Sequence, residues 1–312
     1  MSLNGTAVRP CWEQLPMLLR DGLTARLGPI TSAQPQSGGF TPGLAARIQL
    51  VDGDRVFVKG IDSGHALADR YRAEAEVVRA LPAEAPAPRL RWDAEIAGWS
   101  VLAFDDAAGR HADLAPGSRD IPLVAEMIAS LAAVLTPCPV SHVPHAAAEL
   151  AGLVHGWKEL AAEPPADLDA WALRNLDSLT ESESTWLTAA DGKTLLHGDI
   201  NASNLLVADT TVLLVDWGQP ASGAAWIDVA DLIPHLILAG HTPAAAEQAI
   251  TGALSATGVH PDVVTSYAIA FAGYWARTSR QPAPPGVPNL RSYQARAAAA
   301  ALQWVAHRTH WT

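Results

Sequence analysis

The chain has 312 residues, of which 49% are hydrophobic and 17% are charged. This balance is too apolar for a disordered chain and is typical of a folded protein with a large core. The formal net charge is −11, because 32 Asp and Glu outnumber 21 Lys and Arg. Such a field repels nucleic acids and anionic membrane surfaces, so we expect neither as a partner.

The distribution of cysteines and apolar residues indicates a cellular compartment. Only Cys11 and Cys138 are present, without metal-type spacing, which excludes a disulfide scaffold and is typical of cytosolic thiols. The start of the chain lacks the basic and apolar pattern of a secretory signal. No run reaches the roughly 18 apolar residues that a membrane-spanning helix needs. We therefore expect a cytoplasmic protein; its oligomeric state is left open.

Residues 31–61 have the pattern of a β-rich start. Residues 37–43 (SGGFTPG) form a glycine-containing turn, and residues 44–51 and 55–61 have the composition of strands. Asp52-Gly53-Asp54 between them is a hairpin signal.

A helix and a second hairpin are expected next. Over residues 66–81 apolar side chains recur about once per helical turn, and Pro82 ends the segment. The proline-rich stretch that follows cannot continue a helix. Residues 89–96 and 98–104 then resemble two strands joined at Ala97-Gly98.

From about residue 119 the pattern is helical, interrupted by one β-like segment over residues 194–217. We therefore predict an α+β fold of two lobes. Residues 1–104 would form a small β-rich lobe that binds a nucleotide, and residues 105–312 a larger, mainly helical lobe with the catalytic and acceptor-binding groups.

The β-like segment contains the motifs with a chemical meaning. Asp199 follows His197-Gly198 and is separated from Asn204 by four residues, as in the catalytic loop of kinases. Asp216-Trp217-Gly218 occupies the place of the metal-binding D-F-G motif. In phosphoryl transfer one carboxylate orients the attacking hydroxyl, while an amide oxygen and a second carboxylate hold Mg²⁺. Each motif alone is better explained as a turn or a strand end, but both together, with two strands between them, favour a kinase.

On these motifs the chain resembles the aminoglycoside phosphotransferase and choline kinase-like family, whose fold is similar to that of protein kinases. The resemblance covers about residues 30–240. It implies that Lys59, on the strand after the glycine turn, binds the phosphates and that Glu74 of the following helix pairs with it. Glu76 is the competitor for this role, and for both acids the structural alternative is a solvated helix face. Glu74 is favoured because it lies beside apolar residues.

The same resemblance implies further nucleotide-binding residues. Ser37, Gly38 and Gly39 are similar to the turn that covers the nucleotide, where small residues let main-chain N–H groups approach phosphate; the alternative is an ordinary hairpin turn. Asp105 and Ala107 are assigned by position to the linker between lobes that binds adenine through main-chain groups, with the register left open.

Other polar residues near the motifs receive structural assignments. Asp228 is similar to an aspartate that braces the catalytic loop. For His197 we favour a bracing role over that of a general base, because Asp199 already supplies the carboxylate. Asp231 is either substrate-facing or, as we favour, a helix-surface acid. The eleven tryptophans could stack on sugar rings, but burial in the core is the simpler expectation for most of them.

The resemblance implies an ATP- and Mg²⁺-dependent small-molecule O-phosphotransferase. Asp199 would orient the acceptor hydroxyl, and Asn204 and Asp216 would hold the metal. Expected acceptors include aminoglycosides and related antibiotics, that is, cationic or sugar-like alcohols, so resistance and metabolism are both open as roles. The alternative is a nucleotide-binding pseudokinase with a regulatory role, which the complete set of motif residues disfavours. A protein kinase is disfavoured because no activation-loop motif follows Gly218.

Overall fold

The computed structural model describes residues 7–312. Residues 1–6, which fall in the predicted 1–104 lobe and in the segment inspected for a signal, lie outside the described residues. The chain forms two compact units. The first comprises the chain up to His111, Ser203–Gln219 and Ala283–Leu290; the second comprises Ala112–Ala202, Pro220–Pro282 and Arg291–Thr312. The lobe boundary expected after residue 104 stays a prediction.

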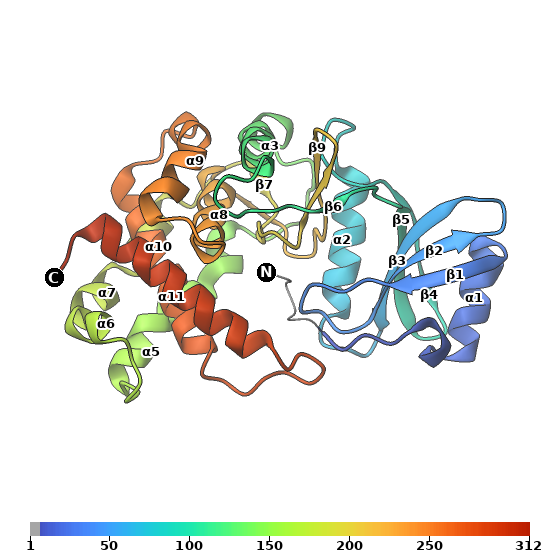
Figure 1. Ribbon diagram of the computed structural model, residues 1–312, viewed down its shortest axis with the longest axis horizontal. Coiled ribbons are helices and arrows are strands. Elements are labelled where there is room, and N and C mark those ends of the chain that lie inside the picture. The colour runs from blue at the N-terminus through green and yellow to red at the C-terminus, as the bar shows by residue number, and fades with distance from the viewer. Residues whose placement is uncertain (1–6) are drawn as a thin grey trace. The chain divides into compact units, whose positions relative to one another are not determined.

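The first unit is built on a five-stranded antiparallel sheet of order β1-β2-β3-β5-β4 (Figure 1). Its elements are β1 (Ile30–Pro35), β2 (Leu44–Leu50), β3 (Arg55–Asp62), β4 (Leu90–Ile96), β5 (Trp99–Asp105), the 3-10 turn η1 (Trp12–Gln14), and the helices α1 (Met17–Leu27) and α2 (Ala68–Ala80). Both predicted hairpins and the helix between them are confirmed. Neither β1 nor α1 was expected; β1 is an edge strand of mostly exposed residues without apolar alternation.

The helices α1 and α2 cover opposite faces of this sheet (Figure 1). Leu19 and Leu23 of α1 share a buried apolar cluster with Val56 and Val58 of β3. Because successive side chains of a strand point to opposite faces, Lys59 of β3 lies on the other face, toward α2. The alternation of β3 therefore decides where this lysine points.

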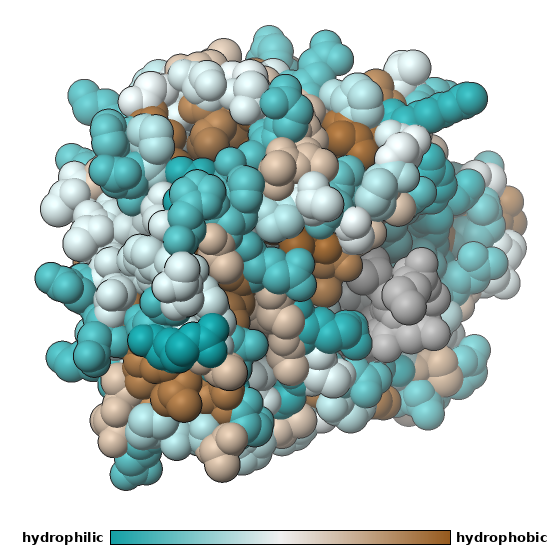
Figure 2. All heavy atoms as spheres, turned by 60° about the vertical axis from the view of Figure 1, so that its left-hand side comes forward, coloured by the Kyte–Doolittle hydropathy of each residue, from teal (hydrophilic) through white to brown (hydrophobic). Residues whose placement is uncertain are grey.

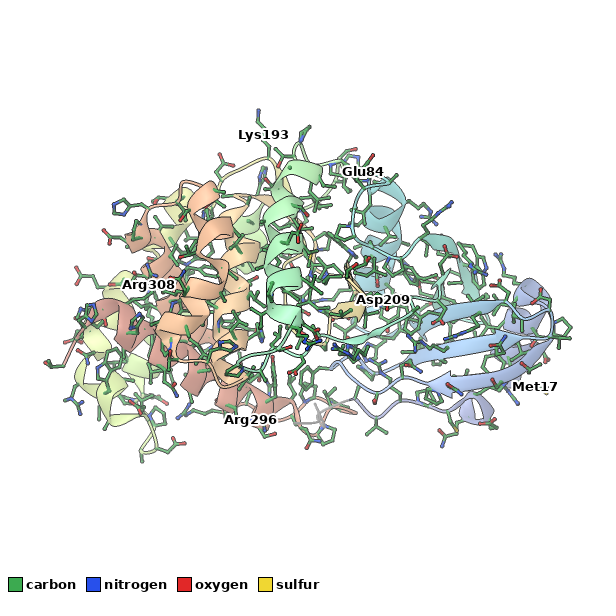
Figure 3. All side chains as sticks on the ribbon, turned by 45° about the horizontal axis from the view of Figure 1, so that its top comes forward. Met17, Glu84, Lys193, Asp209, Arg296 and Arg308 are labelled. Carbon is green, nitrogen blue, oxygen red and sulfur yellow. The ribbon has the colours of Figure 1, made fainter. Side chains whose placement is uncertain are left out.

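A smaller sheet completes the first unit. It has the order β6-β8-β9 and consists of β6 (Arg110–His111), β8 (Leu205–Ala208) and β9 (Thr211–Leu214). The hairpin of β8 and β9 lies within the predicted β-like segment. Asp209, labelled in Figure 3, lies at the tight turn between the two strands and is exposed.

The second unit is mainly helical, as expected. Its elements are α3 (Asp120–Val134), α4 (Ala146–Glu149), η2 (Leu150–His155), α5 (Gly156–Ala162), α6 (Ala170–Arg174), α7 (Leu176–Ser182), η3 (Thr185–Ala189), α8 (Trp226–Leu238), α9 (Pro243–Ala256), α10 (Pro261–Thr278) and α11 (Leu290–Thr309), with a two-stranded pairing of β7 (Thr194–Leu196) and β10 (Ala221–Gly223). Helix α10 packs against α5 and α7, and α8 packs against α9.

Helix α8 is almost completely buried in the second unit. Every residue from Trp226 to Ile237 is buried, including two aspartates and a histidine. The side chains of Trp226, Trp275 and Trp304 are also buried, whereas Trp311 stacks on Trp171. Burial in the core is therefore the main role of these side chains.

The predicted α+β class is confirmed. In Figure 2 hydrophilic residues cover most of the visible face, and the apolar groups on it are small and separate. No helix in residues 7–312 combines the length and apolar composition needed to cross a bilayer.

Candidate active site

The predicted glycine turn joins β1 to β2. Gly38 and Gly39 have φ angles of +118° and +68°, a region that L side chains rarely adopt, so this turn favours glycine. Ser37 is exposed. The carbonyl of Gly39 accepts a 3.2 Å hydrogen bond from the N–H of Ala7. Contact of these residues with phosphates stays a prediction.

Lys59 lies between two carboxylates. Its Nζ is 2.6 Å from Oε2 of Glu74 on α2 and 2.7 Å from Oδ1 of Asp216, which follows β9. Nζ also lies 5.0 Å from the ring centroid of Tyr71, within range of a cation–π contact. The structure thus brings together three candidate residues from three separate segments of the first unit.

Burial and neighbouring charges shift the pKa values of this group. Burial acts to lower the pKa of Lys59, but attraction to Asp216 and Glu74 outweighs it, and the pKa lies above its ordinary value. For Glu74, burial raises the pKa to about 7, although Lys59 opposes the shift. Lys59 therefore remains a fixed cation at neutral pH.

Asn204 and Asp216 lie at the two ends of the β8-β9 hairpin. The N–H of Val215 donates a 2.9 Å hydrogen bond to the carbonyl of Asn204. The Asp216 side chain is 41% exposed, and its backbone has a φ of +69°. The backbone pairing places the two residues side by side on the hairpin. Amide and carboxylate oxygens fit Mg²⁺, which prefers oxygen ligands and is held by few protein groups when it also binds phosphates. Their role as metal ligands stays a prediction.

The expected adenine linker begins at the end of β5. Asp105 is the last residue of that strand, and its Oδ1 accepts a 2.6 Å hydrogen bond from Arg91. The carbonyl of Ala107 accepts a 2.6 Å hydrogen bond from Arg47. Among the described residues the N–H of Ala107 has no acceptor. Adenine binding by these two residues stays a prediction.

Asp106, between these two residues, anchors the linker to the sheet. Its carboxylate lies 2.8 Å from Nε of Arg47 on β2 and 2.5 Å from Arg55 on β3. The sequence does not indicate this anchor, because three residues distant along the chain meet only once the sheet has formed.

In the second unit, Asp228 of α8 braces the loop that contains Asp199. Its Oδ2 accepts a 2.7 Å hydrogen bond from the N–H of His197, and its Oδ1 a 3.0 Å bond from the N–H of Gly198. The N–H of Asp199 donates to Nδ1 of His197. Burial raises the pKa of Asp228 to about 6, although both N–H donors oppose the shift. Both residues thus have the bracing geometry that the sequence suggested.

Asn201 contacts the predicted catalytic carboxylate directly. Its Nδ2 donates a 2.8 Å hydrogen bond to Oδ1 of Asp199 and a 3.2 Å bond to the carbonyl of Asp199. This contact restricts the rotation of the carboxylate. Asn201 was not among the expected site residues, although its place two residues after Asp199 is an Asx-type spacing that could have indicated it.

The expectation for Asp231 was wrong. Instead of lying on the helix surface, it is buried on α8 and accepts a hydrogen bond from the hydroxyl of Tyr267. Burial raises its pKa well above the ordinary value. Since α8 is enclosed on all sides, it has no exposed face on which an acid could lie in solvent.

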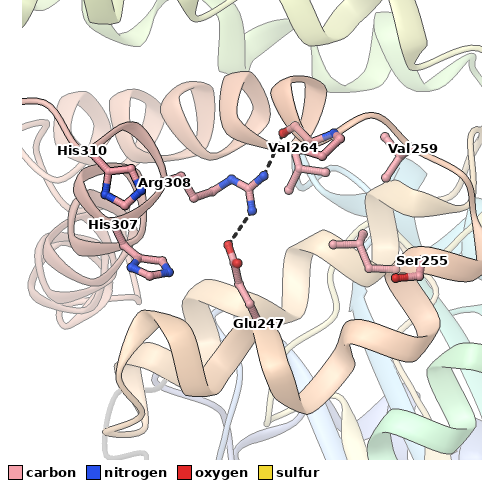
Figure 4. Close-up of a pocket in the computed structure, with 9 residues that line it drawn as sticks. Glu247, Ser255, Val259, Val264, His307, Arg308 and His310 are labelled. Carbon is pink, nitrogen blue, oxygen red and sulfur yellow. Dashed lines mark hydrogen bonds and ion pairs between the residues drawn. The ribbon is translucent and has the colours of Figure 1, made fainter.

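A separate pocket lies in the second unit near α9, α10 and α11 (Figure 4). Its central Arg308 pairs with Glu247 at 2.5 Å and donates a 2.8 Å hydrogen bond to the carbonyl of Pro261. Nε1 of Trp304 also donates to Glu247. None of the predicted site residues lines this pocket, and its arginine is fully engaged in joining helices.

Comparisons with known proteins identify the family. The model of the phosphotransferase enzyme family matches residues 40–264. No curated protein matches the chain.

Solved structures share the fold at low sequence identity. A thermostable mutant of an aminoglycoside phosphotransferase, solved with ADP and hygromycin B, is 13% identical, with 94% of this chain and 99% of that chain covered and a TM-score of 0.61. Choline kinase from Streptococcus pneumoniae is 13% identical, with 90% of this chain and 97% of that chain covered and a TM-score of 0.59. A macrolide 2′-phosphotransferase from Brachybacterium faecium is 17% identical, with 92% of this chain and 98% of that chain covered and a TM-score of 0.54.

These matches confirm the resemblance to aminoglycoside phosphotransferases and choline kinase, and with it the kinase-like α+β fold. The chain belongs to the phosphotransferase enzyme family and is a small-molecule phosphotransferase.

Proposed function

We propose that this phosphotransferase moves the γ-phosphate of ATP to a hydroxyl group of a small cationic or sugar-like molecule, in a reaction that depends on Mg²⁺. The observation that supports this most directly is Lys59, fixed at 2.6 Å from Glu74 and 2.7 Å from Asp216. A lysine held in this way is a phosphate ligand in kinases. The glycine turn over Gly38 and Gly39 belongs to the same unit and supplies main-chain N–H groups.

The chain's own residues have separable roles in this reaction. Lys59 neutralises phosphate charge, and Glu74 keeps its ammonium group in place. Asp199 orients the acceptor hydroxyl and accepts its proton, while Asn201 restricts the carboxylate to one orientation. Asn204 and Asp216 would hold Mg²⁺, which when bound supplies positive charge against the phosphates.

The acceptor class is inferred from charge and from the relatives. Hygromycin B and spectinomycin are bound by two proteins of the same fold, and a net charge of −11 attracts cationic molecules. We therefore propose aminoglycosides, other amino alcohols and sugars as the acceptors to test. A role in antibiotic resistance follows only if an antibiotic is the acceptor.

A phosphate-transfer screen tests the proposal. The purified protein is incubated with γ-labelled ATP, Mg²⁺ and a panel of aminoglycosides, amino alcohols, neutral sugars and anionic sugars. We expect the labelled phosphate to be transferred to a cationic or neutral alcohol. This transfer should be lost when Mg²⁺ is left out. ATP binding without transfer to any member would instead indicate a regulatory nucleotide-binding protein.

A salt series on the acceptor that the screen identifies then tests the electrostatic argument. The KM of a cationic acceptor should rise with ionic strength, because salt screens charges beyond a Debye length of about 8 Å at physiological strength. A neutral sugar should show little change. An anionic acceptor with a KM that falls at low salt would contradict the proposed acceptor class.

A further inference from the structure

The segment that precedes α1 runs along the glycine turn of the first unit. The N–H of Ala7 donates to the carbonyl of Gly39, and the N–H of Val8 donates a 2.7 Å hydrogen bond to the carbonyl of Gly286. These two bonds fix the backbone next to Arg9. The backbone that carries the Arg9 side chain is therefore held next to the glycine turn.

The guanidinium of Arg9 lies under the glycine turn. One terminal nitrogen, Nη2, is 3.2 Å from the point where a Cβ on Gly39 would lie. The other, Nη1, donates a long 3.4 Å hydrogen bond to the carbonyl of Gln36. A side chain at position 39 would compete with Arg9 for this space, which is a second reason for glycine there.

Arg9 has few partners for a partly buried cation. Its Nε is buried without a hydrogen-bond partner in the described part of the chain. Within the same part of the chain, Arg9 forms no ion pair. A guanidinium has five N–H donors, and among the described residues only Nη1 of Arg9 has an acceptor, so the two terminal nitrogens keep donors for a ligand.

Arg9 and Lys59 have a charged neighbour in common. The carboxylate of Asp216, which pairs with Lys59, also acts on the charge of Arg9. The ammonium group of Lys59 is already opposed by the two carboxylates of Glu74 and Asp216. The cluster of these three side chains therefore has an excess of negative charge. Even with a bound Mg²⁺, a triphosphate would add more negative than positive charge to this cluster, so a further cation would stabilise it. Arg9 is a cation that lies at the glycine turn.

We propose that Arg9 is a nucleotide-binding residue, whose guanidinium binds the phosphates of ATP beneath the glycine turn as a second cation beside Lys59. The planar fork of arginine matches phosphate oxygens in a bidentate manner, which a lysine cannot reproduce. This inference rests on the proposed function, because it assigns a residue to the same nucleotide site. Burial lowers the pKa of Arg9 from its ordinary value, and binding an anion restores the balance by favouring the charged form.

Calorimetry with ATP, ADP and adenosine tests the inference without requiring an acceptor. Arg9→Gln removes the charge, Arg9→Lys keeps it without the fork, and Arg26→Gln is the matched control, since Arg26 contacts only the ring of Trp92 in the described structure. We expect Arg9→Gln to weaken ATP and ADP binding by about 10- to 100-fold. Adenosine binding should not change. Arg9→Lys should give an intermediate loss, and Arg26→Gln none.

The outcomes separate this inference from the proposed function. Failure of the wild-type protein to bind ATP would overturn both. Wild-type binding of ATP with equal affinity in Arg9→Gln would overturn the role of Arg9 alone, and so would tighter binding by that variant, which would mean that Arg9 obstructs the site. If Arg9→Gln does not fold, as judged by its thermal unfolding, then Arg9→Lys decides: unchanged ATP affinity in that variant overturns the inference.

Discussion

Glu74 and Glu76 are two positions apart on α2 and lie in opposite environments. Glu74 is 2% exposed and pairs with Lys59, whereas Glu76 lies in solvent. Residues two apart on a helix point in directions about 200° apart, so only one of them can face the sheet. The register of α2 therefore resolves the competition between the two acids.

Glu74→Gln should lower kcat/KM for ATP by about 10- to 100-fold, because the amide oxygen can still accept a hydrogen bond from Lys59 but the negative charge of the ion pair is lost. Glu76→Gln, which changes an exposed side chain of the same helix, should leave kcat/KM unchanged. Steady-state kinetics and thermal unfolding of both variants measure the effect. Equal kinetics for the two variants would remove Glu74 from the phosphate-binding group.

Asp199→Asn should lose about 10²- to 10⁴-fold in turnover, because hydroxyl orientation and proton acceptance by the carboxylate are removed. ATP affinity should be retained, because the predicted phosphate ligands are unaltered. Asp209→Asn is the matched control: Asp209 is exposed at the β8-β9 turn with a φ of +52°, which asparagine tolerates. Near wild-type turnover in Asp199→Asn would refute the assignment.

Asp216→Ala should abolish most of the Mg²⁺ dependence of ATP binding, because the carboxylate predicted to hold the metal is removed. Calorimetric titration of ATP with and without Mg²⁺, on the wild-type protein and the variant, gives the comparison. Asp209→Ala controls for loss of an acid from the same unit. An equal Mg²⁺ effect in wild type and Asp216→Ala would exclude Asp216 as a ligand.

His235 should make the protein less stable in mild acid. It is buried on α8 against the ring of Trp275 and near the hydroxyl of Tyr293, and burial lowers its pKa from 6.5 to about 4. Because the unfolded chain binds the proton first, the stabilising effect is complete above about pH 6.5 and is lost as the pH falls toward 4. Between pH 7 and pH 5 this costs about 2 kcal/mol of unfolding free energy.

Urea unfolding at pH 7 and pH 5 measures this loss. The difference between the two pH values should be about 2 kcal/mol smaller for His235→Gln than for the wild-type protein. His142→Gln, at an exposed position, should behave as the wild type. The prediction fails if His235→Gln and wild type lose the same stability.

Much of the architecture was predictable because it depends on local periodicity. The spacing of apolar residues predicted α2, and turn signals predicted both hairpins of the sheet. Elements without a local pattern, such as the polar edge strand β1, could not be predicted in this way.

The residues of the candidate site also fall into two classes, those that a local sequence pattern predicts and those that it does not. The sequence alone determined the residue types and spacing of Asp199, Asn204 and Asp216, since two motifs and a hairpin are encoded within residues 197–218, and it thereby determined the kind of chemistry. It could not determine which residues from distant segments meet. Arg9 under the glycine turn, Asp106 between two arginines, and the burial of Asp231 were decided only by the tertiary structure, because strand register and helix packing, rather than spacing along the chain, fix which side chains lie within hydrogen-bonding distance.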